Sequence, residues 1–107
     1  MEEGRDEGIE PCGFSLSVNH PNPFNPETRI QYMVQSTKVN PIHTTLSVYN
    51  ILGQLVRTLV DEPKESGTFE VVWDGKDENG NDVASGVYLY RLAAGNFVQT
   101  RKMVLLR

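Results

Sequence analysis

The stretch GVYLYRLAAGNFVQTRKMVLLR, residues 86–107, carries the clearest structural pattern in the chain. Every second residue in its first half is large and apolar, namely Tyr88, Tyr90 and Leu92. A period of two, together with aromatic and β-branched residues, is typical of a β-strand and not of a helix. The turn signal around Gly95 joins this run to a second β-forming run, so the stretch predicts an antiparallel hairpin whose last strand closes the fold.

The same period recurs upstream. Ile30, Tyr32 and Val34 share one face of the run 28–34. Turn signals separate such runs, among them Gly53, a longer connection over 62–67 and the longest loop over 74–85. The predicted strands are 14–19, 28–35, 44–50, 54–61, 68–73, 86–93 and 97–106.

The run 54–61 has an alternative interpretation. Leu55 and Leu59 are four residues apart, a spacing that also fits one helical face. The β-branched content of the run and its position after a hairpin turn favour a strand.

Seven short strands predict an all-β chain with an immunoglobulin-like antiparallel β-sandwich, and a small barrel is the alternative. The Cys and Trp pattern of an antibody domain is not present. Trp73 shares a face with Phe69 and Val71, so we expect it to fill the core. Tyr88 or Tyr90 could act as a corner tyrosine whose hydroxyl fixes a loop.

The segment HPNPFNPETRI, residues 20–30, cannot be a helix or an interior strand, because its prolines lack backbone donors. Phe24 is its single large apolar residue before Ile30. We expect a rigid corner in which Phe24 packs at the end of the sandwich between the two sheets. Asparagine side chains would close its bends. A surface recognition motif is the alternative.

The net charge of −4 over 107 residues comes from the first ten residues, where five acids face Arg5 alone. The remaining nine acids and nine bases cancel. We therefore expect residues 1–13 to be an acidic flexible linker from a larger protein, and residues 14–107 to form one domain. A neutral domain does not suggest a nucleic-acid partner, and no apolar run has the length needed for membrane insertion.

Cys12 is the only cysteine, so an intrachain disulfide is excluded. We interpret this unpaired cysteine as incidental, and pairing with another chain is the alternative. His20 and His43 lack the spacing of zinc ligands. No sequence motif for hydrolysis, phosphate binding or dinucleotide binding is present, so we expect no catalytic residues and no enzyme activity.

One loop combines several oxygen-bearing side chains of the kind that bind calcium. Turn formation explains the same composition, since Asp and Asn close turns and Gly80 supplies a positive φ. The expected cofactor is therefore none, with calcium as the alternative. The candidate calcium ligands are Asp74, Asp77, Asn79, Asn81 and Asp82.

Four stretches together resemble a known family: PNPFNPETRI, LSVYNILGQLVRTLV, WDGKDENGNDVASGVYLYRL and GNFVQTRKMVLLR. They resemble the type A C-terminal sorting domain of type IX secretion cargo, and equally the immunoglobulin-like domain of the flagellar hook-capping protein family. The resemblance runs from about residue 14 to residue 107. The residues that match the family motifs are Pro21, Asn22, Pro23, Phe24, Val48, Tyr49, Asn50, Gly53, Ser85, Gly86, Val87, Tyr88, Gly95 and Lys102.

The resemblance implies a domain without activity that follows a passenger protein and is recognised by an outer-membrane translocon. It also implies removal by a sortase-like peptidase, at a point before the first strand, and an exported, extracellular or cell-surface location. A structural immunoglobulin-like module that spaces extracellular proteins or self-associates through edge strands is the alternative function. A small enzyme or calcium-dependent lectin is a third. The segment 36–45 is longer and more polar than the family link, which suggests an insertion or a contact loop.

Overall fold

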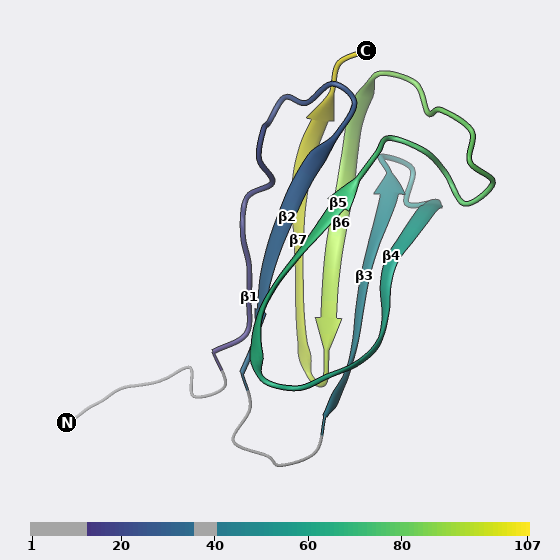
Figure 1. Ribbon diagram of the computed structural model, residues 1–107. Coiled ribbons are helices and arrows are strands. Elements are labelled where there is room, and N and C mark those ends of the chain that lie inside the picture. Colours follow the sequence, from purple (N-terminus) through teal and green to yellow (C-terminus); the bar gives the residue numbers. More distant parts are fainter. Residues whose placement is uncertain (1–12, 36–40) are drawn as a thin grey trace.

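The computed structural model describes residues 13–35 and 41–107, which form two antiparallel sheets packed face to face. One sheet has the order β1-β2-β5, and the other has the order β4-β3-β6-β7 (Figure 1). The expected sandwich is confirmed, and each of the seven predicted strands is present. Their bounds are β1 (Ser15–Leu16), β2 (Thr28–Val34), β3 (Ile42–Asn50), β4 (Leu55–Lys64), β5 (Gly67–Trp73), β6 (Gly86–Ala94) and β7 (Phe97–Leu105).

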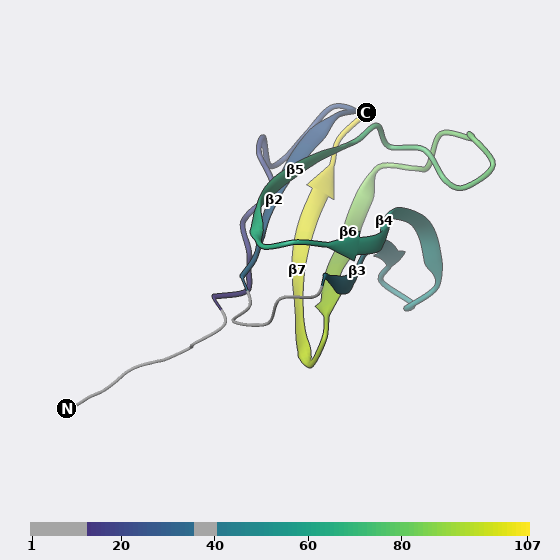
Figure 2. The ribbon, with the colours of Figure 1, turned by 60° about the horizontal axis from the view of Figure 1, so that its bottom comes forward.

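The period of two predicted from the sequence matches the alternation of buried and exposed side chains along the strands. In β2 every second side chain from Thr28 to Val34 is buried, and in β6 the side chains of Tyr88, Tyr90 and Leu92 are buried. These inner faces meet across the sandwich, as the turned view shows (Figure 2). The largest fully buried side chains are Trp73, Tyr32, Tyr90, Phe24, Leu16, Ile30, Leu46, Leu92, Met103, Leu105, Val34 and Val48.

The closing hairpin is confirmed. β6 and β7 pair along their whole length, from Gly86 opposite Leu105 to Ala94 opposite Phe97. Gly95 between them has a φ of +59°, a conformation that favours glycine. β7 is the outermost strand of its sheet, and its loss would remove the buried side chains of Met103 and Leu105 from the core.

The connection predicted at 62–67 is wrong in its first half, because β4 continues to Lys64. Pro63 lies opposite His43 in the β3–β4 pair. Proline is tolerated there because β4 is an edge strand, where one side of the backbone has no neighbouring strand to bond. The pairing of the ten-residue strand β4 with β3 also rules out the helical alternative for 54–61.

Two other boundaries differ from the prediction. β3 begins at Ile42, so the end of the polar segment 36–45 is part of the sheet, whereas residues 36–40 lie outside the described residues, as do residues 1–12 of the expected linker with Cys12. β1 is only two residues long, because the chain from Ser17 onward is held by separate hydrogen bonds that lead into the proline segment.

Tyr90 ties the two sheets together. Its hydroxyl donates to the Ser17 carbonyl oxygen at 2.8 Å and accepts from the Asn19 N–H at 2.8 Å. Ser17 and Asn19 follow β1, whereas Tyr90 belongs to β6 of the other sheet. Burial raises the pKa of the Tyr90 hydroxyl, so the neutral form that makes both bonds is favoured. Tyr88 fixes a loop in a similar way, by donating to the Ala84 carbonyl oxygen at 2.6 Å, so both tyrosines do what the sequence suggested for one of them.

Tyr90→Phe should lower the free energy of unfolding by roughly 1–3 kcal/mol, because it leaves the buried Asn19 N–H and the Ser17 carbonyl unpaired. Urea unfolding followed by tryptophan fluorescence measures this, since Trp73 is the only tryptophan. Tyr49→Phe is the control, because Tyr49 lies on the outward side of β3 and is half-buried. Equal midpoints for the two variants would show that the Tyr90 hydroxyl does not hold the sheets together.

Candidate functional site: the proline corner and the closing strand

The proline corner, residues 20–26, crosses the end of the sandwich between β1 and β2 (Figure 1). The peptide bonds before Pro21, Pro23 and Pro26 are cis. Phe24 is 2% exposed, and its ring centroid lies 5.6 Å from that of Trp73, which in turn lies 5.5 Å from Tyr88. Trp73 and Tyr88 belong to different sheets, so the expectation that Phe24 packs between the sheets is confirmed.

The corner also covers the free edge of β7. The Phe24 N–H donates to the Val104 carbonyl oxygen at 3.0 Å, and the Leu106 N–H donates to the Phe24 carbonyl oxygen at 2.9 Å. The Asn22 Oδ1 accepts from the Val104 N–H at 3.0 Å. Asn22 was expected to close its own bend, and it caps the neighbouring strand instead. An exposed edge can pair with another chain, so these bonds protect β7 from that reaction.

Two buried polar residues hold the corner in shape. The Asn19 Nδ2 donates to the Pro21 carbonyl oxygen at 3.1 Å and to the Thr28 Oγ1 at 3.0 Å. The Thr28 hydroxyl donates to the same Pro21 oxygen at 2.9 Å. The sequence analysis did not single out these residues. The period of two in β2 could have identified Thr28, because it places Thr28 on the same buried face as Ile30 and Tyr32. A buried hydroxyl without a hydrogen-bond partner is costly, so a partner for Thr28 was to be expected.

The last residue of the chain joins the same end of the sandwich to the loop 74–85. The Arg107 Nε donates to the Val83 carbonyl oxygen at 2.6 Å, and its Nη2 donates to the Gly75 carbonyl oxygen at 2.6 Å. Gly75 has a φ of +76°, and a Cβ at this position would lie 2.8 Å from the Arg107 Nη2 and 3.1 Å from the Pro26 carbonyl oxygen. Only glycine therefore fits where the corner, the loop and Arg107 meet.

The structure brings most of the motif residues to one end of the sandwich (Figure 1). Gly53, with a φ of +85°, turns the β3–β4 hairpin, and Gly86 and Tyr88 begin β6 opposite Leu105 and Met103. Gly95 lies at the opposite end of the sandwich, in the β6–β7 turn. Lys102 lies apart from both ends, on the outward side of β7 opposite Leu89. The motif residues are thus mainly scaffold around the corner, with Lys102 as an exposed member.

The asparagine hairpin at this end is tied by one side chain. The Asn50 Oδ1 accepts from the N–H groups of Leu52 and Gln54, each at 3.0 Å. The Asn50 Nδ2 donates to the Gln54 Oε1 at 2.8 Å. The hairpin therefore keeps its shape without contacts from the core, and it holds Leu52 79% exposed.

The candidate calcium loop uses its oxygen atoms for turns and ion pairs. The Asp77 Oδ1 accepts from the N–H groups of Asn79 and Asn81, at 2.9 and 3.0 Å. The Asp82 carboxylate lies 2.8 Å from the Lys76 Nζ, and this hydrogen bond lowers the pKa of Asp82. The Asp74 Oδ1 accepts from the Lys76 N–H at 3.1 Å. Within residues 13–35 and 41–107, three or more His, Cys, Asp or Glu side chains do not gather where they could hold a metal. The expectation of no cofactor, with calcium as the alternative, stays a prediction.

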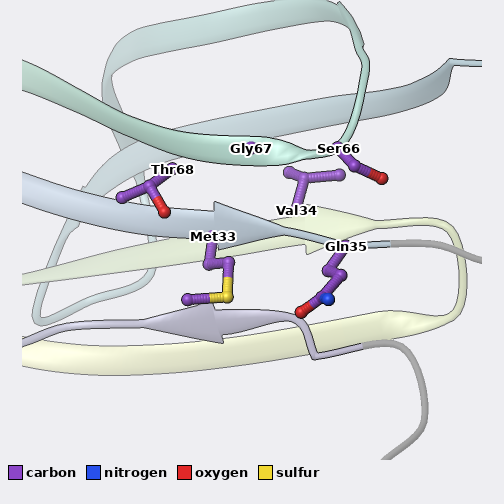
Figure 3. Close-up of a pocket in the computed structure, with 6 residues that line it drawn as sticks. All are labelled: Met33, Val34, Gln35, Ser66, Gly67 and Thr68. Atoms are coloured by element: carbon purple, nitrogen blue, oxygen red, sulfur yellow. The ribbon is translucent and has the colours of Figure 1, made fainter.

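A shallow hollow of about 330 Å³ lies at the other end of the three-stranded sheet (Figure 3). Met33 and Gln35 point from the β2 chain toward β1, and Gly67 lies opposite Val34 in the β2–β5 pair. The lining is Met33, Val34, Gln35, Ser66, Gly67 and Thr68, and it includes no ionisable side chain. The hollow has the size of a small ligand site but not the residues for acid–base chemistry.

Among the described residues, no helix has the length and hydropathy to cross a membrane.

Two antiparallel sheets joined by corner tyrosine bonds define an immunoglobulin-like β-sandwich. The chain belongs to the FlgD Ig-like domain family, whose model matches residues 28–98. The family resemblance seen in the sequence is therefore confirmed. No curated protein matches the sequence.

Several solved structures share the fold, and three of them are described. Dimeric latent PorU from Porphyromonas gingivalis superposes with a TM-score of 0.70 and 19% identity over 94% of this chain. PorZ, an essential surface component of the type IX secretion system of the same organism, superposes with a TM-score of 0.55 and 22% identity over 89% of this chain. The Pseudomonas fluorescens alkylpurine DNA glycosylase AlkC, bound to DNA with an abasic site analogue, superposes with a TM-score of 0.56 and 10% identity over 90% of this chain.

The chain spans 10% of the PorU chain, 12% of the PorZ chain and 31% of the AlkC chain. At these identities the similarity shows the fold alone. The fold is thus that of one module within much longer proteins.

Phe24→Ala should lower the free energy of unfolding by about 3–5 kcal/mol, because it removes a buried ring and leaves a cavity between the sheets. Urea unfolding measures the loss. Phe14→Ala is the matched control, since the Phe14 ring is only partly buried and stacks on Phe97 at 5.5 Å. If Phe24→Ala unfolds at the same urea concentration as the unchanged chain, the corner is not scaffold and its role is at the surface.

Titration with calcium should give no binding heat and no rise in Tm, because the Asp77 and Asp82 carboxylates already hold N–H groups and Lys76. Isothermal calorimetry and thermal unfolding measure the two quantities. Asp77→Asn is the variant for comparison. A saturable heat that this substitution abolishes would establish the calcium site.

Proposed function

We propose that the chain is the non-catalytic C-terminal sorting domain of a larger exported bacterial protein, recognised by the outer-membrane translocon of type IX secretion. The observation that supports the proposal is that the fold of nearly the whole chain recurs within about a tenth of PorU and PorZ, the second of which is a secretion component by its own description. Membership of the FlgD Ig-like domain family supports a module of this kind.

In this role the chain acts as an address and performs no reaction. Its core is filled with large side chains, which leaves the hollow beside Met33 as a shallow surface feature. The passenger would precede the acidic residues 1–13, and a sortase-like peptidase would cut in that segment after export. The product would be an extracellular or cell-surface protein freed from its sorting domain.

The proline corner gives the address a fixed shape. Phe24 is buried, so the surface that machinery could read at this end consists of the exposed prolines around it and the hairpin tip at Leu52. Both elements keep their shape through the internal hydrogen bonds of Asn22 and Asn50. A preformed surface loses little conformational freedom on binding, which favours recognition.

A structural module that self-associates is the second candidate, and the edge of β5 favours it. β4 is capped by the loop 74–85, because the Glu78 N–H donates to the Val56 carbonyl oxygen at 3.1 Å and the Glu78 Oε2 accepts from the Thr58 N–H at 2.6 Å. β5 is the outermost strand of its sheet, and in the described part of the chain no strand pairs with its other side. The presence of the fold in AlkC shows that it is not confined to secretion proteins.

The whole chain, residues 1–107, should export a neutral reporter that carries a periplasmic signal peptide when both are fused in a bacterium with type IX secretion. The measurement is the fraction of reporter outside the cell, with deletion of β7 as the negative control because it removes the folded address. A reporter that stays in the periplasm, while a sorting domain native to that bacterium exports it, would refute the proposal and leave the structural module.

A further inference from the structure

The outer face of β6 and β7 is a surface with a defined composition. We use the name outer face for the side chains on these strands that point away from the core. Strand pairing places Val87 beside Val104, Leu89 beside Lys102 and Arg91 beside Thr100. The residues that alternate with them along the two strands, such as Tyr88, Tyr90 and Met103, point to the other side and fill the core. The outer face therefore combines an aliphatic strip with two bases.

The two bases lie together and have no acidic partner among the described residues. Arg91 is paired with Thr100, so Lys102 is its diagonal neighbour, at roughly 7–8 Å between backbone positions. Both side chains are exposed. The remaining bases of the closing strand are engaged, since the Arg101 Nε donates to the Leu16 carbonyl oxygen at 2.6 Å and the Arg107 Nε donates to the Val83 carbonyl oxygen.

The aliphatic part of the outer face is also open. Val87 is 40% exposed, although it lies within a strand that has neighbours on both sides. Val98, farther along β7, is 54% exposed. Sheets that face water on one side normally carry polar residues there. A pair of bases bordered by exposed valines is instead the composition of a binding surface, in which arginine is enriched.

We propose that the outer face docks an acidic protein partner, with carboxylates opposite Arg91 and Lys102 and apolar side chains on Val87, Leu89 and Val104. This inference rests on the proposed function, and it names the chemistry by which the export machinery recognises the domain. Complementary charge is the argument for the occupant, because Arg91 and Lys102 lie side by side without an acidic partner among the described residues.

A protein partner fits better than an anionic membrane. Each base near a lipid surface contributes about 1 kcal/mol, and recognition of lipids usually takes four to eight of them. The outer face spans two strands of nine residues each, which gives roughly 300 Å² from ordinary strand spacing. That area is smaller than the ~800 Å² per partner of a standard interface, so we expect a weak and reversible contact.

The test uses the whole chain fused to the exported reporter. Arg91→Glu and Lys102→Glu should each lower the exported fraction about tenfold, because a like charge now faces the partner's carboxylates. The double variant Arg91→Lys/Lys102→Arg should export like the unchanged chain. Arg29→Glu is the matched control, since Arg29 is an exposed base on the outward side of β2 and has the same change in charge.

Each possible result supports or overturns the proposed docking surface. Equal export of the unchanged chain and the two charge reversals, at equal Tm, overturns the docking surface and leaves the sorting role intact. A loss as large for Arg29→Glu overturns it as well, since any charge change would then suffice. Failure of the unchanged chain to export refutes both proposals. Binding of the purified chain to vesicles with 30% phosphatidylglycerol, lost in the two reversals, would replace the protein partner with a lipid surface.

Discussion

The fold depends on one contact between its two ends. Phe24 near the start of the domain bonds through its backbone to Val104 and Leu106 near the end, and its ring closes the core over Trp73. The edge of β7 and the gap between the sheets are thus sealed by the same residue. Arg107 extends this closure to the loop 74–85, so three distant segments meet where only Gly75 leaves enough room.

The arrangement separates stability from recognition along the chain. The motif residues at the corner are mostly committed to scaffold, because Phe24 is buried and Asn22 caps β7. The exposed features include the corner prolines, the tip at Leu52, the edge of β5 and the bases Arg91 and Lys102. The family motif therefore marks mainly the residues that shape the domain. The strand residues that a partner can touch are those that alternate with the buried ones.

The strands could be predicted from the sequence because burial follows a period of two along each of them. Ile30, Tyr32 and Val34 are buried as that period requires, and the place of Phe24 followed from its being the lone large apolar side chain among prolines. The extent of β4 through Pro63 could not be predicted, because tolerance of proline depends on which strand lies at the edge. The bond from Val104 to Asn22 spans 82 residues, and local pattern carries no information on such pairs.

The distance in sequence between Phe24 and its partners has a consequence for biosynthesis. The core cannot be closed until β7 has been made, since Phe24 lies near the start of the domain and its bridge partner Leu105 lies near the end. Contacts of such long sequence separation form slowly, because the entropy of closing the chain must be lost first. The nascent chain therefore cannot complete its core until its last strand has been synthesised.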